Sequence, residues 1–342
     1  MLSIDEKRVY GDRGGATTAY VASDVGVVRV LVSGTTVGEF GLLERCSARD
    51  IAAGVGVLAV ATDEDVLVGW LGAGDEDGDA NEVAASHPPF EPTGFGPAVA
   101  VGVHERTVLA ADERGNVSRL DLEAETSETA TDDWLPLEYG TDTPSPSTVR
   151  AIAGDLVATD VGVFREWNGR LEHAGLTEVR DVSAAGVPLA ATADGLYKLG
   201  NGWMKEVDGS VDLVCADPLS EPGSLARAHA VAADGLYVFV DVSSSTDASS
   251  SEGDPSRTST STGTATASDG WTPVESDGAI PSSDSIAGVA YGEAVYAVTT
   301  DGTFLAADTA STRDPSWRAH TLGVSGVSGL VVPLEPATDR GV

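Results

Sequence analysis

The feature that most constrains this chain is a short phrase that occurs seven times along its 342 residues. In each copy a small residue and a Ser, Thr or Ala precede an Asp, and a β-branched or aromatic segment follows. The copies lie at 22–27, 61–63, 110–112, 158–163, 192–197, 232–237 and 299–304. Successive aspartates are 34 to 49 residues apart, except for a last step of 67 that includes a Ser/Thr-rich run. Repeats of this length are typical of β-propeller blades.

Each copy of the phrase predicts the turn of a β-hairpin. An apolar strand such as 187–192 ends at Asp-Gly or Asp-Val-Gly, where a tight turn needs a residue that tolerates positive φ, and a second strand returns. A further strand follows the hairpin and in several repeats begins near a Trp, as at Trp134, Trp203, Trp271 and Trp317. A short strand also precedes the hairpin, at 48–54, 149–154, 179–186, 211–217 and 285–292. Four strands per repeat make one blade.

A four-stranded blade cannot bury both of its faces alone, whereas seven blades stacked around an axis can. We therefore predict an all-β fold, a seven-bladed β-propeller in which residues 1–342 form a single domain. The C-terminal run 324–333 is expected to be the inner strand of the first blade; alternatively, residues 1–10 supply that strand and the tail is a cap. Insertions at 72–81, 123–133 and 241–269 each fall between the third and fourth strands of a blade. The last is Ser/Thr-rich and is expected to be a disordered loop within blade six.

The charge balance is strongly acidic, with 54 acidic and 20 basic residues and a formal net charge of -34. Such a charge strains a compact fold by self-repulsion unless concentrated salt screens it, with a Debye length of about 3 Å at 1 M. An acid-rich, Lys-poor composition is the general pattern of cytosolic proteins from salt-accumulating archaea, and therefore says little about partners. The absence of a basic run argues against nucleic-acid binding, and the absence of a long apolar stretch argues against a membrane span. We therefore expect a halophilic, cytoplasmic monomer.

The N-terminal run DRGGATTAYVASDVGVVRV, together with VGEFGLLERC and ATDVGVFR, resembles an uncharacterised haloarchaeal β-propeller family. The resemblance spans nearly the whole chain outside the insertions. It implies a seven-bladed propeller and a haloarchaeal source. The family carries no assigned activity, so the resemblance transfers no catalytic residue, cofactor or partner.

The sequence contains no recognisable catalytic or metal-binding motif. Cys46 and Cys215 lie in apolar strand contexts in different repeats and are expected to be buried free thiols. The histidines have no Glu or Cys at ligand spacing and are expected at the surface or the edge of the core; they are His87, His104, His173, His229 and His320. No catalytic residue, metal or cofactor is therefore predicted.

One set of basic residues occupies equivalent positions. Arg49, Arg150 and Arg180 stand at the same register near the start of three predicted inner strands. Because inner strands line the axis, the three guanidinium groups are candidates for binding an anion or an acidic peptide near one mouth of the channel. The alternative is that they form salt bridges between blades with the neighbouring Asp50, Asp181 and Asp212. The acidic residues that could approach the axis are Asp50, Asp181, Asp212 and Asp284.

Two functions from different classes follow from these residues. The first is a non-enzymatic interaction platform that binds a protein segment or a small anion at the axial channel mouth. The second is a metal-dependent propeller hydrolase or lactonase that holds its metal with the inward acidic residues. A stoichiometric metal after purification would favour the enzyme.

Overall fold

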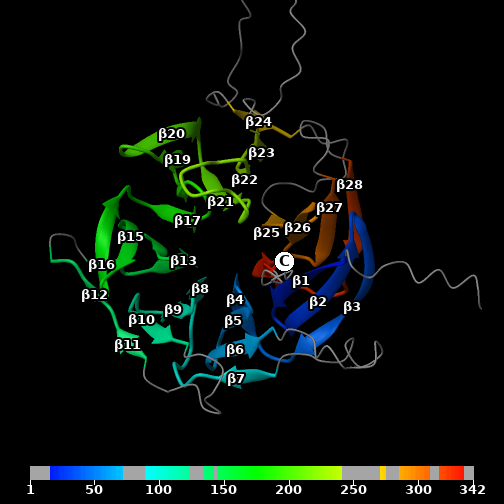
Figure 1. Cartoon of the computed structure of the whole chain (residues 1–342), viewed down its shortest axis with the longest axis horizontal. Coiled ribbons are helices and arrows are strands. Elements are labelled where there is room, and N and C mark those ends of the chain that lie inside the picture. Colours follow the sequence, from blue (N-terminus) through cyan, green and yellow to red (C-terminus); the bar gives the residue numbers. More distant parts are fainter. Residues whose placement is uncertain are drawn as a thin grey trace, which may run out of the picture.

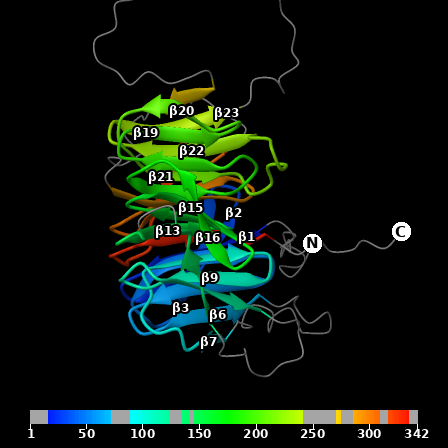
Figure 2. The ribbon, with the colours of Figure 1, turned by 90° about the vertical axis from the view of Figure 1, so that its left-hand side faces the viewer.

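The computed structural model describes residues 16–71, 89–122, 134–141, 145–240, 270–274, 285–308 and 316–334. Their strands form seven sheets that radiate from a common axis, as Figure 1 shows along the axis and Figure 2 from the side. The predicted seven-bladed, all-β fold is therefore confirmed. Within the described ranges, no helix is long and apolar enough to cross a lipid bilayer.

Each blade runs from an inner strand at the axis to an outer strand at the rim. Blade one consists of β29 (Gly329–Val331), β1 (Ala16–Ser23), β2 (Gly26–Ser33) and β3 (Thr36–Glu44). Blade two consists of β4 (Ala48–Gly54), β5 (Val57–Thr62), β6 (Val66–Trp70) and β7 (Phe90–Pro92). Blade three consists of β8 (Ala100–His104), β9 (Thr107–Ala111), β10 (Val117–Asp121) and β11 (Leu135–Pro136). Blades four and five consist of β13 (Val149–Ala153), β14 (Leu156–Thr159), β15 (Gly162–Trp167) and β16 (Arg170–Gly175); and β17 (Val179–Ser183), β18 (Leu189–Thr192), β19 (Gly195–Leu199) and β20 (Trp203–Asp208). Blades six and seven consist of β21 (Val211–Ala216), β22 (Arg227–Ala232), β23 (Gly235–Val240) and β24 (Trp271–Pro273); and β25 (Ile286–Tyr291), β26 (Val295–Thr299), β27 (Thr303–Ala307) and β28 (Trp317–Thr321).

The ring closes through the C-terminal strand. β29 pairs antiparallel with β1, with Leu330 opposite Val21, so the last strand of the chain is the inner strand of blade one. In Figure 1 the red end of the described chain accordingly lies beside the blue β1 at the axis. The predicted closure by the C-terminal run is confirmed, and it joins the two ends of the ring by backbone hydrogen bonds.

Blade four departs from the predicted four strands. A short additional strand, β12 (Glu138–Tyr139), pairs parallel with the outer strand β16 and makes a five-stranded sheet. The segment belongs to the connection between blades three and four. Its parallel direction follows because it approaches the rim of blade four from the preceding blade instead of returning through a hairpin.

The core consists of seven apolar clusters, each between two neighbouring blades. On β1, for example, Ala19 and Val21 pack toward blade seven, whereas Tyr20 and Ala22 pack toward blade two. Successive side chains of a strand point to opposite faces, and both faces of a blade are covered. This is why the middle strands read as continuous apolar runs without an apolar-polar alternation.

Close approach between inner strands requires small residues. A Cβ on Gly102 of β8 would lie 2.4 Å from Cγ2 of Ile152 on β13, and one on Gly288 of β25 would lie 2.9 Å from the backbone N of Leu330 on β29. Neither distance is compatible with a real side chain. The glycines therefore allow the inner strands to converge at the axis.

The seven Asp turns connect the second and third strands of each blade, as predicted, but the aspartate is not their most buried member. Ser or Thr closes the turn in five blades: the hydroxyl of Thr159, for example, donates to the Gly162 carbonyl at 2.7 Å and accepts from the Gly162 N–H at 3.0 Å. These hydroxyl residues are at most 2% exposed, and they are Ser23, Thr62, Thr159, Thr192 and Thr299. A buried hydroxyl that satisfies both backbone groups explains why the residue precedes the Asp so regularly.

The predicted insertions 72–81, 123–133 and 241–269 lie outside the described residues. The strands that flank them, β6 and β7, β10 and β11, and β23 and β24, pair within blades two, three and six. Each insertion therefore connects the third and fourth strands of its blade.

Candidate binding site at the propeller axis

A cavity of about 500 Å³ lies on the axis and is lined by the inner strands of all seven blades. Most of the lining is small and apolar, with Ala52, Ala153, Ala184, Ala216 and Ala290 among its residues. These small side chains leave space open at the axis. The polar groups in the lining are therefore the ones that would select an occupant.

Five of the inner strands carry a β-bulge at the same level. In each bulge the register to the second strand shifts by one residue, so that one inner-strand residue has no partner across the ladder. The unpaired residues are Arg49, Arg150, Arg180, Asp212 and Ala287. A bulge redirects the side chain of the extra residue. The three arginines, which stand at equivalent positions in the sequence, are thus each the extra residue of a β-bulge.

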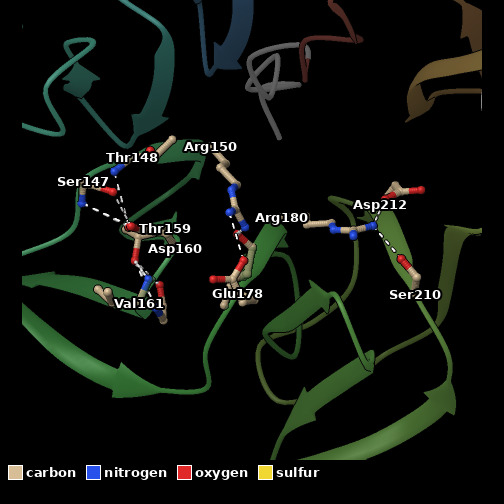
Figure 3. Close-up of polar contacts among 12 residues, drawn as sticks. Ser147, Thr148, Arg150, Thr159, Asp160, Val161, Glu178, Arg180, Ser210 and Asp212 are labelled. Carbon is tan, nitrogen blue, oxygen red and sulfur yellow. Dashed lines mark hydrogen bonds and ion pairs between the residues drawn. The ribbon is translucent and has the colours of Figure 1, made fainter.

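The arginines reach toward the next blade. Arg49 Nη1 lies 2.8 Å from Glu113 Oε1 in the Asp turn of blade three. Arg150 donates to the Val179 carbonyl of blade five at 3.0 Å and pairs with Glu178 at 3.1 Å (Figure 3). Both pairs therefore bridge neighbouring blades, as in the salt-bridge alternative, but their partners are glutamates and not the predicted aspartates.

Arg180 makes the corresponding contact with blade six. It donates to Ser210 Oγ at 2.6 Å and pairs with Asp212 (Figure 3). Arg150, Arg180 and Asp212 also line the axial cavity, whereas Arg49 does not. The structure thus brings two of the three predicted arginines to the cavity.

Two predicted acidic residues line the cavity directly after a bulge. Asp50 accepts hydrogen bonds from the N–H of the following residue at 2.8 Å and from the Val101 N–H of blade three at 2.9 Å. Asp181 makes the same pair of bonds, to the following residue at 2.9 Å and to the Val214 N–H of blade six at 2.8 Å. Burial raises the pKa of each carboxyl to about 7, although the two backbone hydrogen bonds oppose this.

The other predicted acidic residues have different surroundings. Asp212 is engaged by Arg180, and Asp284 lies outside the described residues. Within the described part of the chain, no three His, Cys, Asp or Glu side chains converge as ligands for a metal ion.

A buried polar cluster between blades six and seven was missed by the sequence reasoning. His229, expected at the surface or core edge, is 5% exposed, and its Nδ1 lies 2.5 Å from the hydroxyl of Tyr291 on the inner strand β25. Burial, together with the charge of Arg227, lowers the pKa of His229 to about 3, so the imidazole is neutral. Arg227 lies over the Tyr291 ring and pairs with Asp217 at 2.5 Å. The position of His229 within the apolar run of a second strand was the signal for its burial.

The remaining described histidines lie where they were expected, and both cysteines are free thiols as predicted but less buried than expected. His104, His173 and His320 are exposed. Cys46 and Cys215 are free thiols, each half-buried, and Cys215 lines the cavity. Burial raises the pKa of the Cys215 thiol to about 12, which makes it a poor nucleophile.

Seven radial blades around an axial cavity define the class of this protein as a seven-bladed β-propeller. Within that class, the chain belongs to the HVO_0234-like β-propeller family, whose model matches residues 3–333. The family resemblance of the sequence is thereby confirmed.

The similarity to known structures concerns the fold alone. The β-propeller domain of Myceliophteria thermophila Cps50 (Swd1) is similar with a TM-score of 0.53 and 12% identity, over 91% of this chain and 93% of that one. The WD40 β-propeller domain of Doa1 has a TM-score of 0.49 and 13% identity, over 90% of this chain and 87% of that one. Among curated proteins, none matches the chain.

Proposed function

We propose that this protein is a non-enzymatic, cytoplasmic interaction platform that binds a protein segment or a small anion at the axial mouth on the face of the Asp turns. The observation that carries the proposal is the axial cavity, about 500 Å³ in volume, with Arg150 and Arg180 in its lining. The propeller holds these side chains on rigid inner strands, which is the arrangement a preformed binding site requires.

The interblade ion pairs are compatible with exchange for a ligand. The side chains of Glu178 and Asp212 are 58% and 48% exposed, and exposed ion pairs contribute only about 0 to 1 kcal/mol each. An acidic group of a partner can therefore replace Glu178 or Asp212 at low cost. Each guanidinium has five N–H donors, more than its described contacts use, and can engage a carboxylate bidentately.

The hydrolase alternative has less support from the acidic residues. Asp50 and Asp181 each already accept two backbone hydrogen bonds, and Asp212 is paired with Arg180. Stoichiometric calcium in the purified protein, measured by elemental analysis, would nevertheless favour the enzyme over the platform.

The platform is tested by binding with a matched control. The variant Arg150→Gln/Arg180→Gln is compared with Arg170→Gln, which changes an exposed arginine on the outer strand β16. Immobilised proteins are exposed to a high-salt lysate of the source cell, and sulfate binding is measured by calorimetry. We expect the wild type and Arg170→Gln to retain the same partner or bind sulfate, and the double variant to lose at least tenfold in affinity. Equal binding by all three proteins would contradict the proposal.

A further inference from the structure

Asp50 and Asp181 are the same structural element in blades two and five. Each follows the bulge residue of its inner strand, and each carboxyl group links that strand to the backbone of the next inner strand, at Val101 and Val214. Two of the seven blade interfaces are therefore joined at the axis by a carboxyl group. In blade four, the corresponding position is Ala151, which cannot make this link.

The surroundings of Asp50 contain almost no countercharge. The strands packed against β4, which are β1, β5, β8 and β29, carry no Asp, Glu, Lys or Arg; their titratable side chains are Tyr20 on β1 and His104 at the far end of β8. A Cβ on Gly329 would lie 3.8 Å from Asp50 Oδ1, so the β29 backbone lies close to the carboxyl. The neighbouring Arg49 is engaged by Glu113, and the charge of Asp181 adds to the rise in the pKa of Asp50.

The charged groups around Asp181 are likewise engaged with one another. The paired strand β18 and the neighbouring strand β14 are uncharged, β13 carries Arg150, and β21 carries Asp212 and Cys215. Arg150 is engaged by Glu178, while the neighbouring Arg180 is engaged by Asp212. The guanidinium groups near Asp181 are thus already paired with other carboxylates.

We propose that the carboxyl groups of Asp50 and Asp181 are pH-sensitive links between inner strands. Their protonation sets both the strength of two blade interfaces and the charge of the axial cavity. The part that concerns the cavity rests on the proposed function of the axial mouth. When both carboxyls are protonated, they contribute no charge to the cavity and do not repel each other. When both are ionised, they add two negative charges, so an anionic occupant binds less tightly at higher pH.

The sign of the effect on stability follows from linkage. The folded state binds these two protons more tightly than the unfolded state, since the pKa of each carboxyl rises from 3.8 to about 7 on folding. Their contribution is therefore fully present below pH 3.8 and is lost as the pH rises through about 7. Between these values, each group increases the unfolding equilibrium constant by about tenfold per pH unit.

The stability test measures unfolding in denaturant from pH 4.5 to 8.5 at fixed KCl. The proteins are the wild type, Asp50→Asn, Asp181→Asn, the double variant, and Glu39→Gln as a control on the exposed outer strand β3. We expect the stability of the wild type and of the control to fall in parallel as the pH rises. Each single variant should lose about half of the pH dependence that the two carboxyls contribute, and the double variant should lose all of it. Identical pH profiles for the wild type and the double variant would overturn the proposal.

A second measurement does not depend on the folding of the variants. Carboxyl carbon NMR of the wild type should contain two Asp resonances that titrate near pH 7, and each should disappear in one single variant. Titration of every Asp resonance below pH 5 would overturn the proposal even if no variant folded.

The cavity is tested with sulfate as the probe. Its affinity should fall between pH 6 and 8 in the wild type and remain constant in the double Asn variant. Suppose that the Asp resonances titrate near pH 7 but that substitution of Arg150 and Arg180 does not change sulfate binding. The pH-sensitive links between inner strands are then supported, and the proposed function fails. If sulfate binds through the arginines with a pH dependence that the Asn variants share, the proposed function stands and the regulation fails.

Discussion

At the residue scale, the buried hydroxyl found in five of the seven hairpin turns does more for the fold than the aspartate of the same turn. Thr159 is fully buried and satisfies both the N–H and the carbonyl of Gly162, whereas Asp160 receives bonds from exposed Ser147 and Thr148. An unsatisfied buried backbone group costs more than an exposed polar contact contributes. The repeated phrase is therefore maintained by its Ser or Thr as much as by its Asp.

We predict that Thr159→Val lowers the free energy of unfolding by about 1 to 3 kcal/mol, since it removes both buried hydrogen bonds that the Thr159 hydroxyl makes with the Gly162 backbone. Denaturant unfolding at fixed KCl measures the change. Thr321→Val, at the exposed end of β28, is the control and should change stability by less than about 0.5 kcal/mol. A loss no greater than that of the control would show that the hydroxyl is dispensable.

At the element scale, the inner strands combine two opposing requirements. They must approach each other closely at the axis, which Gly102 and Gly288 allow, and they must present polar groups there, which the bulges allow. Because the bulge adds one unpaired residue, Arg180 and Asp181 can engage blade six simultaneously through a side chain-side chain pair and a side chain-backbone bond. The polar groups at the axis thus arise from irregularities in otherwise regular strands.

Gly102→Ala should destabilise the protein by about 1 to 3 kcal/mol because its methyl group would overlap Ile152 and separate blades three and four. The matched change Gly41→Ala, on the open outer strand β3, meets no atom within 4 Å and should be neutral or slightly stabilising. Denaturant unfolding of the two variants compares them directly. Equal stability of the two would mean that the inner strands adjust without cost.

At the scale of the whole molecule, seven interblade cores and one backbone closure hold a chain of net charge -34 together. No single large core exists among the described residues; each cluster belongs to one interface. Repulsion among surface carboxylates acts on all seven interfaces, so stability should depend on the ionic strength of the medium.

We expect the thermal unfolding midpoint to rise by at least several degrees between 0.2 and 3 M KCl, because the Debye length falls from about 7 Å to less than 3 Å. Sucrose at matched osmolality, which does not screen charge, is the control for general exclusion effects. A midpoint that rises as much in sucrose as in KCl, or does not rise at all, would contradict the halophilic interpretation.

The sequence by itself determined the number of blades and the hairpin in each, because these depend on periodicity and local turn chemistry. It left the closing strand open between the C-terminal run and residues 1–10, and the pairing of β29 with β1 decided it. It also identified Arg150, Arg180, Asp50 and Asp181 as residues near the axis. The tertiary structure alone decided which groups they contact, since a bulge changes the direction of a side chain without an obvious mark in the sequence. The same holds for the burial of His229 against Tyr291, which depends on how two blades meet and not on either strand alone.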